Sequence, residues 1–227
     1  MRAPISVIIP TLNAARTLPG CAASLMEGLD AGLIREVIVS DGGSTDDTAA
    51  IARSLGAEVL TGPPSRGGQL GRGCAAGQGD WLLILHADTQ LARGWAEAVA
   101  AHLEQPSAGP AYFRLAFRAA GLRPALVAGW ANLRASLFGL PYGDQGLLLR
   151  REDYERAGGY PDQPLMEDVA LVRALDKPLT ELPVQALTSA ERYQRGGWLR
   201  RGARNLWTLL RYVLGADPEA LAVRYRR

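Results

Sequence analysis

The chain has 227 residues, of which 48% are hydrophobic and 21% charged, and its formal net charge is +2. This composition excludes a disordered chain, fits one domain with a sizeable core, and gives no argument for nucleic-acid binding. The two cysteines, Cys21 and Cys74, make no disulfide framework, and neither has a metal-ligand residue at short spacing, so we expect a reduced, cytoplasmic protein. No apolar run approaches about 20 residues, and we therefore expect no membrane span.

The first half of the chain alternates strand-like apolar runs with helix-like segments. The predicted strands cover residues 5–10, 35–40, 58–60 and 81–86. The predicted helices cover residues 14–28, a segment that begins at Ser44 or Thr45, a segment that ends at about Gly77, and residues 93–103. Such alternation is typical of βαβ units, so we expect an α/β fold with a mostly parallel, Rossmann-like sheet flanked by helices.

The second half is less regular. The elements predicted there are strands over 111–118 and 146–150 and helices over 122–138 and 167–175. Residues 105–110 contain two prolines and a glycine, and we expect them to mark an internal boundary. It separates a first half of about residues 1–105 from a second half of about 110–195, inside a single domain over 1–195.

Residues 196–227 form a helical tail in this prediction. On a helical wheel, residues 198–214 divide into an apolar half and a polar half. The apolar half holds Trp198, Leu199, Ala203, Leu206, Trp207, Leu209, Leu210, Val213 and Leu214, and the polar half holds Arg200, Arg201, Arg204, Asn205, Thr208 and Arg211. Such a helix either packs on the protein or lies on a membrane surface. We favour packing, and leave peripheral membrane contact and oligomer formation open.

Three polar motifs directly follow predicted strands. They are Pro10-Thr11-Leu12-Asn13, the run from Asp41 to Asp47 (Asp-Gly-Gly-Ser-Thr-Asp-Asp), and His86-Ala87-Asp88-Thr89. Because ligands of open α/β sheets bind beyond the carboxyl ends of the strands, we expect the three motifs to form one site. The Asp41 carboxylate can accept the N–H groups of a uracil or guanine base. The alternative for this run is a plain turn before a capped helix.

Three further segments carry polar groups that suit a ligand. The loop Ser65-Arg66-Gly67-Gly68-Gln69 precedes a helix, whose first amides receive anions well, and Arg66 can pair with a phosphate through two hydrogen bonds. The other two segments are Gly143-Asp144-Gln145-Gly146 and Met166-Glu167-Asp168. Adjacent acids at a helix start are also common for a structural reason, because they suit the positive end of the helix dipole.

The order and spacing of these motifs resemble the family 2 glycosyltransferases, which have a GT-A fold, over about residues 5–200. The His-Ala-Asp-Thr, Gly-Asp-Gln-Gly and Met-Glu-Asp segments are similar to a small bacterial subgroup often labelled as associated with radical-SAM enzymes or arsenosugar biosynthesis. The resemblance implies an inverting enzyme that moves a sugar from a nucleoside diphosphate sugar, UDP being favoured, to an unknown small-molecule or lipid acceptor.

The resemblance also implies roles for the donor-side residues. Asp41 would contact the base, and Pro10, Thr11 and Asn13 would line the base and ribose pocket. Ala87 would also lie against the donor. The family usually has Asp-x-Asp where this chain has His86-Ala87-Asp88, so Asp88 would be the ligand of a divalent cation, Mn²⁺ or Mg²⁺. His86 could instead donate to a ribose hydroxyl or bind Mn²⁺ as a neutral imidazole.

On the acceptor side, the resemblance makes Asp168 the general base. Asp144, Gln145 and Glu167 would contact the acceptor or the transferred sugar, and Arg66 would contact the donor phosphates. Two other functions stay open: a nucleotide-binding regulator or inactive relative, suggested by His86, and a sugar-phosphate nucleotidyltransferase. The second usually needs a Gly-rich loop with Arg and Lys near the N-terminus, which residues 10–16 lack.

Overall fold

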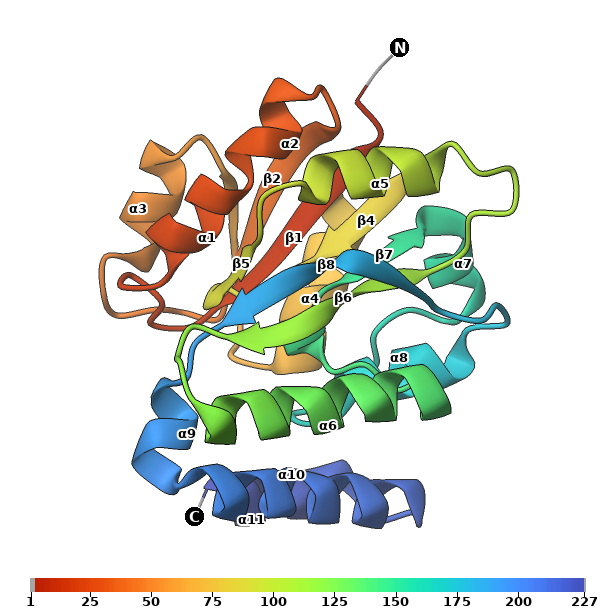
Figure 1. The fold of residues 1–227 in the computed structure, drawn as a ribbon. Helices are drawn as coiled ribbons and strands as arrows, with labels where there is room; N and C mark the ends of the chain where they lie inside the picture. The colour runs from red at the N-terminus through yellow and green to blue at the C-terminus, as the bar shows by residue number, and fades with distance from the viewer. Residues whose placement is uncertain (1–2, 227) are drawn as a thin grey trace.

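The computed structural model describes residues 3–226, without the Arg226 side chain, and contains one eight-stranded sheet (Figure 1). The strand order across the sheet is β3-β2-β1-β4-β7-β6-β8-β5. The strands are β1 (Ile5–Thr11), β2 (Ile34–Asp41), β3 (Glu58–Thr61), β4 (Trp81–Ile84), β5 (Thr89–Leu91), β6 (Ala111–Phe117), β7 (Leu147–Arg150) and β8 (Thr180–Thr188). A mixed α/β sheet flanked by helices confirms the predicted fold class.

The four strands β3, β2, β1 and β4 are parallel and make up the first half of the sheet. The central strands β1 and β4 are almost entirely apolar and buried, because both faces of this part of the sheet are covered. The register pairs Thr11 with Asp41, and Asp41 with Thr61. The polar residues that follow these strands therefore meet at one edge of the sheet, as predicted from the motifs.

The second half of the sheet is mixed. Strand β7 runs antiparallel to both β4 and β6, β8 is parallel to β6, and β5 is antiparallel to β8. The sequence analysis missed both β5 and β8. Pro183 lies inside β8, where the register slips between Phe113 and Arg114 of β6. A proline cannot donate to the ladder and fits a strand only at an edge or an irregularity. The sequence of β8 therefore does not predict a strand.

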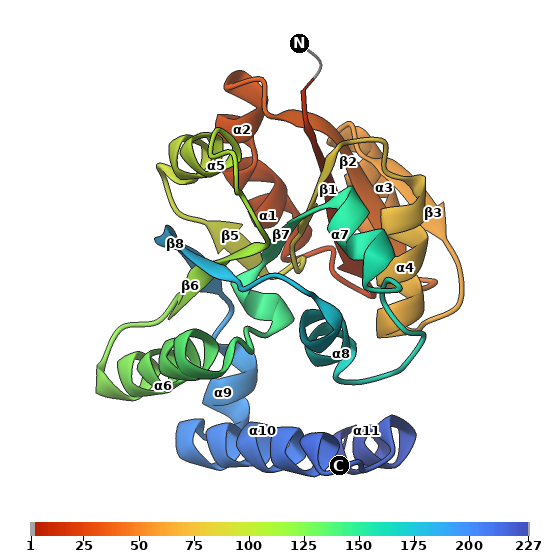
Figure 2. The ribbon, with the colours of Figure 1, turned by 90° about the vertical axis from the view of Figure 1, so that its right-hand side faces the viewer.

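Helices cover both faces of the sheet. Figure 2 shows α1 (Leu18–Ser24), α2 (Met26–Asp30) and α5 (Trp95–Leu103) on one side and α4 (Arg66–Ala76), α7 (Arg151–Arg156) and α8 (Glu167–Ala174) on the other. Each side has its own hydrophobic core, and Trp95 and Phe113 are fully buried in the first of them. Helix α7 was not predicted from the sequence. Cys21 and Cys74 are buried free thiols, as expected.

Two helix starts differ from the predictions. The segment predicted over 14–28 is irregular up to Thr17 and breaks at Leu25 into α1 and α2. Helix α3 (Thr48–Ser54) begins after Asp47, not at Ser44 or Thr45. The reason is that the Ser44 hydroxyl donates to the Asp41 carboxylate rather than capping a helix.

Helix α6 (Leu122–Phe138) and three C-terminal helices lie beyond one edge of the sheet (Figure 1). The three are α9 (Glu191–Gly196), α10 (Trp198–Val213) and α11 (Pro218–Arg226), and α10 packs against α6. The tail helix packs on the protein, but with its polar side: Arg201 and Asn205 face the protein, and most of the apolar half that was expected to pack is exposed. Within residues 3–226, no helix is both long and apolar enough to cross a membrane.

Candidate active site

The Asp41 carboxylate organises the loops at the ends of β1 and β2. Its Oδ1 accepts hydrogen bonds from the Thr11 hydroxyl at 2.9 Å and the Ser44 hydroxyl at 2.5 Å, and its Oδ2 accepts from the amides of Gly43 at 3.0 Å and Ser44 at 2.7 Å. Burial raises the pKa of Asp41, but these donors outweigh burial and hold it below its usual value. With four donors, the carboxylate is saturated. Asp41 does not line the cavity beside it, so its predicted contact with a base stays a prediction.

Asn13 holds the same pair of loops together from the other side. Its backbone has a φ of +52°, in the left-handed region that asparagine tolerates better than most residues. Its side-chain Oδ1 accepts a hydrogen bond from the Thr45 backbone amide at 2.9 Å, and its backbone amide donates to Ser44 Oγ at 2.8 Å. The Gln69 side chain adds a third tie, because its amide group donates to the carbonyls of Thr11 at 2.7 Å and Ser40 at 3.0 Å. Sequence analysis did not identify Gln69.

A large cavity of about 590 Å³ opens at this edge of the sheet. Six of the predicted donor-side residues line it: Pro10, Thr11, Asn13, Arg66, His86 and Ala87. Asp88 lines it too, as predicted for a residue of the same site. Segments distant in the sequence complete the wall, among them Ser189, Arg192 and Tyr225.

The N-terminus of α4 lies at one wall of this cavity. Ser65 caps the helix by accepting a hydrogen bond from the Gly68 amide at 3.3 Å. At Gly67 only a glycine fits, because a Cβ there would lie 1.9 Å from the Pro161 carbonyl oxygen. This close approach brings Arg66 to the start of α8, where its Nε lies 2.9 Å from Glu167 Oε1.

Glu167 is 1% exposed and lines neither cavity of the site, which corrects the prediction that it contacts the acceptor. Burial raises the pKa of Glu167, and the opposing charge of Arg66 lowers it. Glu167 therefore positions Arg66 at the cavity wall. Met166, just before it, has a φ of +65°, a left-handed turn that starts α8 beside the cavity.

His86 and Asp88 follow β4 and line both the large cavity and a smaller one of about 110 Å³. Burial lowers the pKa of His86, as does the charge of Arg66, so the imidazole is neutral at neutral pH. Its ring lies against the backbone of Gly143, where a Cβ would be 2.5 Å from Nε2. The glycine therefore lets the loop before β7 close over the ring.

Two carboxylates from the second half face His86 and Asp88 across the smaller cavity, namely Asp144 and Asp168. Asp168 Oδ2 accepts from the Gly143 amide at 2.7 Å, and its Oδ1 accepts from the Val169 amide at 2.8 Å, so the carboxylate is fixed in place. Asp144 differs, because its buried Oδ1 has no hydrogen-bond partner among the described residues. Burial raises the pKa of Asp144 to about 6, although Arg134 opposes the shift.

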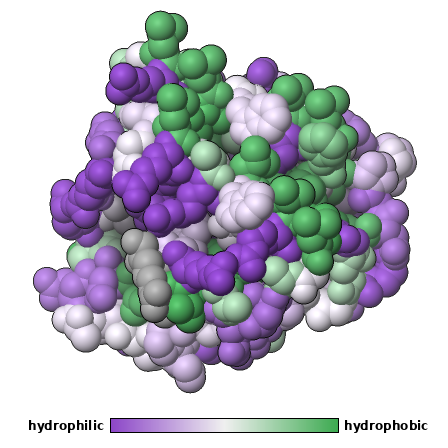
Figure 3. Space-filling model, turned by 90° about the horizontal axis from the view of Figure 1, so that it is seen from below, coloured by the Kyte–Doolittle hydropathy of each residue, from purple (hydrophilic) through white to green (hydrophobic). Residues whose placement is uncertain are grey.

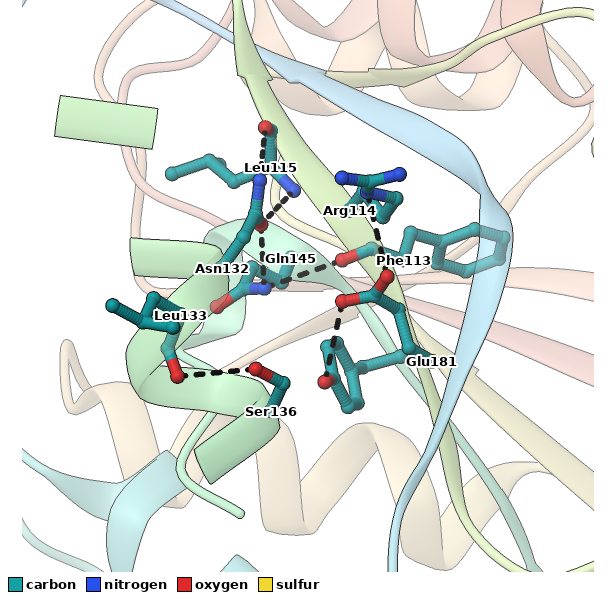
Figure 4. A network of polar contacts seen from close by, with 9 residues as sticks. Phe113, Arg114, Leu115, Asn132, Leu133, Ser136, Gln145 and Glu181 are labelled. Carbon is teal, nitrogen blue, oxygen red and sulfur yellow. Dashed lines mark hydrogen bonds and ion pairs between the residues drawn. The ribbon is translucent and has the colours of Figure 1, made fainter. Parts of the chain in front are cut away.

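Gln145 does not reach the cavity, which corrects its prediction as an acceptor contact. Its side chain is fully buried, and its Nε2 donates to the Phe113 carbonyl at 3.3 Å and to Asn132 Oδ1 at 3.4 Å (Figure 4). Asn132 in turn bonds both backbone groups of Leu115. Gln145 thus ties the loop that carries Asp144 to β6 and α6. In this tight turn the Gln145 side chain points away from the cavity that its neighbour Asp144 lines.

The C-terminal helices roof the smaller cavity. Arg201, Asn205 and Tyr225 line it from α10 and α11, and Arg192 and Tyr193 from α9. The roof is held by its own hydrogen bonds: Arg201 Nη2 donates to the Tyr225 hydroxyl at 3.0 Å, and Asn205 Nδ2 donates to the Tyr193 hydroxyl at 2.9 Å. Sequence analysis did not assign these residues to the site. The polar half of the predicted tail helix was the available signal.

The fit to a divalent cation rests on the carboxylates. Within the described part of the chain, no three His, Cys, Asp or Glu side chains are grouped closely enough to hold a metal ion alone. Asp88 nevertheless lines both cavities, and Asp144 lines the smaller one. Mn²⁺ and Mg²⁺ favour such oxygen ligands. The residues fit a cation that takes a carboxylate from the protein and its other ligands from a bound anion and water.

The family model of glycosyl transferase family 2 matches residues 6–134, more than half of the chain. The chain belongs to glycosyl transferase family 2. The predicted resemblance to this family is therefore confirmed, whereas membership of the small bacterial subgroup stays a prediction. The match covers the strand-end motifs of the first half and ends inside α6, before Asp144 and Asp168.

Individual relatives agree with the family. A PGL/p-HBAD biosynthesis glycosyltransferase of Mycobacterium bovis is 38% identical over 99 residues, which cover 40% of this chain and 38% of the relative. Glucosyl-3-phosphoglycerate synthase from Mycobacterium tuberculosis, solved with Mn²⁺, UDP and phosphoglyceric acid, is 27% identical with a TM-score of 0.53, over 78% of this chain and 67% of that chain.

The fold is also similar to that of TarS from S. aureus, with a TM-score of 0.62 at 14% identity over 94% of this chain and 66% of that chain. These structures confirm the predicted GT-A fold. The first curated relatives are much longer than their matched segments, which span 26% and 38% of their lengths.

Proposed function

We propose that this glycosyltransferase moves a sugar from a nucleoside diphosphate sugar, UDP being favoured, to an acceptor hydroxyl with inversion at the anomeric carbon. One observation carries the proposal. The large cavity at the strand ends and the smaller roofed cavity share Arg66, His86 and Asp88, so a donor in the first would present its reacting carbon to the second. The match to a synthase solved with UDP and Mn²⁺ supports this choice of donor.

The large cavity suits the donor. Its volume of about 590 Å³ lies within the usual range for small-molecule sites. The nucleoside would lie on Pro10, Thr11 and Asn13, and the phosphates would lie near Arg66 and the first amides of α4. Both a guanidinium group and a helix N-terminus favour phosphate oxygens. Glu167 keeps Arg66 oriented through their ion pair.

Asp88 would hold a divalent cation together with the donor diphosphate. When bound, the cation neutralises the charge that develops on the departing diphosphate. The neutral imidazole of His86, whose ring lies against the Gly143 backbone, is available as a hydrogen-bond partner for the donor. This arrangement needs only one carboxylate at the motif, which accommodates the replacement of the usual first aspartate by His86.

Asp168 would act as the general base. Two backbone amides hold its carboxylate at the wall of the smaller cavity. The acceptor hydroxyl gives its proton to Asp168 while its oxygen forms a bond to the anomeric carbon. The bond from that carbon to the diphosphate oxygen breaks, and the diphosphate leaves with the electron pair on the opposite side. Asp144 lies beside Asp168 and would contact the acceptor or the transferred sugar.

A product assay distinguishes this proposal from its alternatives. The protein is incubated with each UDP-sugar and Mn²⁺, and release of UDP is measured with and without a panel of hydroxyl acceptors. We expect UDP release that depends on the metal and on one sugar. A protein that binds nucleotide but never releases UDP would be an inactive or regulatory relative. Pyrophosphate release from UTP and a sugar phosphate would identify a nucleotidyltransferase.

A further inference from the structure

Helix α10 is oriented opposite to the usual packing of an amphipathic helix. Its polar residues Arg201 and Asn205 face inward and line the smaller cavity, and Thr208 is buried. Its apolar residues point outward, since Leu199 is 73% exposed, Trp207 62% and Leu214, the C-cap residue, 76%. A helix in a globular protein normally buries its apolar side. The apolar half identified on the helical wheel therefore lies mostly on the surface.

Helix α6 extends this surface. It shows an apolar stripe to solvent, consisting of Leu122, Leu126, Trp130, Leu133, Leu137 and Phe138, which are between 47% and 82% exposed. Together α6 and α10 carry eleven of the seventeen exposed large hydrophobic side chains found among the described residues, and Leu214 is a twelfth. Figure 3, viewed from the side where these helices lie, shows hydrophobic residues gathered into a broad area. We call it the α6–α10 face.

The two helices that make this face carry only positive charges. Residues 122–138 and 198–214 contain six arginines and no Asp or Glu, although the whole chain has a net charge of +2. The rest of the chain therefore has four more acidic than basic residues. Arg123, Arg200 and Arg211 form no ion pair with any described residue, and Arg123 and Arg200 are exposed. This surface is complementary to a negatively charged partner.

We propose that the α6–α10 face docks on an anionic lipid surface, with its apolar side chains inserted at the level of the headgroups and its arginines against the lipid phosphates. Apolar residues with tryptophan on one side and arginine beside them are what a helix lying in a membrane interface requires. A second copy of the chain fits less well. A symmetric contact would place arginines against arginines, with no acidic side chain on either helix to pair with them.

Docking has a consequence for the site, which rests on the proposed function. The inner side of α10 lines the smaller cavity, and a helix with its side chains is about 10 Å thick. The acceptor cavity of the docked enzyme would then lie about one helix diameter from the lipid headgroups. Docking itself does not depend on which reaction the enzyme catalyses, so it can be tested without a substrate.

The test is flotation of the full chain with vesicles of phosphatidylcholine alone or of equal parts phosphatidylcholine and phosphatidylglycerol. We expect binding to the anionic vesicles that weakens with salt, since salt screens charges near the surface. The double variants L126E/W130E and W207E/L210E should each lower the partition constant by about 10- to 100-fold, because each removes two inserted side chains. The control M26E/L55E alters equally exposed residues away from this face and should bind normally.

Tryptophan quenching by brominated lipid tests the orientation. Brominated lipid should quench the fluorescence of Trp130 and Trp207 in the wild type, and this quenching should be lost in W130F/W207F. The same variant should still float with anionic vesicles, because phenylalanine is also apolar. Absence of binding to anionic vesicles would overturn the proposal. So would equal loss of binding in M26E/L55E. A wild-type dimer in sedimentation that becomes monomeric in W207E/L210E would also overturn it, by showing that a second copy covers the face.

Discussion

The two sides of the site are built in different ways. At the large cavity, polar groups come mainly from the turns after β1 and β4 and from the start of α4, and the neighbouring Asp41 is saturated by donors from Thr11 and its own loop. At the smaller cavity, Arg66, His86 and Asp88 meet polar groups from several separate segments between Asp144 and Tyr225, and the buried Oδ1 of Asp144 has no partner among the described residues. The first side is preorganised by its own hydrogen bonds, whereas the second holds one buried carboxylate oxygen that no described residue pairs.

The difference indicates where function and stability reside. Removing a side chain whose hydrogen bonds are all made should lower the stability of the fold. Removing a buried polar group that has no partner should raise the stability but reduce activity. Substitutions on the two sides should therefore change stability in opposite directions.

The largest expected effect is on Asp168. Replacement by asparagine keeps the shape and one of the two backbone hydrogen bonds but removes the base, so kcat should fall by about 10²–10⁴-fold. Affinity for the nucleotide should stay nearly unchanged, because Asp168 lies outside the large cavity. Single-turnover kinetics together with nucleotide titration measure the two effects. Near-normal turnover would remove Asp168 from the role of base.

On the saturated side, Asp41→Asn should lower the free energy of unfolding by about 1–3 kcal/mol at pH 7, because an amide accepts fewer hydrogen bonds than the carboxylate. The pKa of Asp41 is depressed in the folded protein, so the carboxylate stabilises the fold above the unfolded pKa and this contribution is lost as pH falls. Denaturant titrations should therefore show the difference fading toward low pH. The exposed Asp47, replaced by Asn, is the control and should show no such loss.

On the unsatisfied side, Asp144→Asn should stabilise the protein by about 1–2 kcal/mol at pH 7.5 while reducing activity. The folded pKa is about 6, above the unfolded value, so the charged carboxylate destabilises the fold as pH rises through that window. The gain should disappear at pH 4. Melting curves of this variant and of the exposed control Asp176→Asn measure it, and a loss of stability at pH 7.5 would contradict the comparison.

A smaller effect is expected in the roof. Tyr225→Phe removes the hydroxyl that Arg201 and Asn205 hold, which is worth about 0.5–1.5 kcal/mol. The KM for the acceptor should rise by about 2- to 12-fold, with kcat and donor affinity little changed. Steady-state kinetics separate these parameters. If donor affinity changes instead, the roof serves the large cavity, which Tyr225 also lines.

The sequence predicted the first half of the molecule better than the second. Residues after a parallel strand necessarily meet at one sheet edge, so Thr11, Asn13 and Asp88 could be placed together from their spacing alone. Which atoms of a turn face a cavity depends on backbone angles and neighbouring donors. For this reason Gln145 and Glu167 were predicted to contact the acceptor, although both side chains are buried and line neither cavity.

The rest of the site depends on long-range packing. Strand β8 was missed because Pro183 and a register slip hide its pattern, and β8 leads directly into the segment with Ser189 and Arg192. The tail helix was predicted, but its outward apolar side was not. A helical wheel gives the two sides of a helix without saying which one packs.

The most direct test of the donor site is thermal stability with a panel of nucleoside diphosphates and their sugars, with and without Mn²⁺ or Mg²⁺. A ligand at 100 times its Kd adds about 2.7 kcal/mol, which for a chain of this size raises the melting midpoint by about 5–10 °C. We predict such a metal-dependent shift with UDP or its sugar, lost in Asp88→Ala. A folded protein that shows no shift with any nucleotide, or a shift that Asp88→Ala leaves unchanged, would contradict the proposed site.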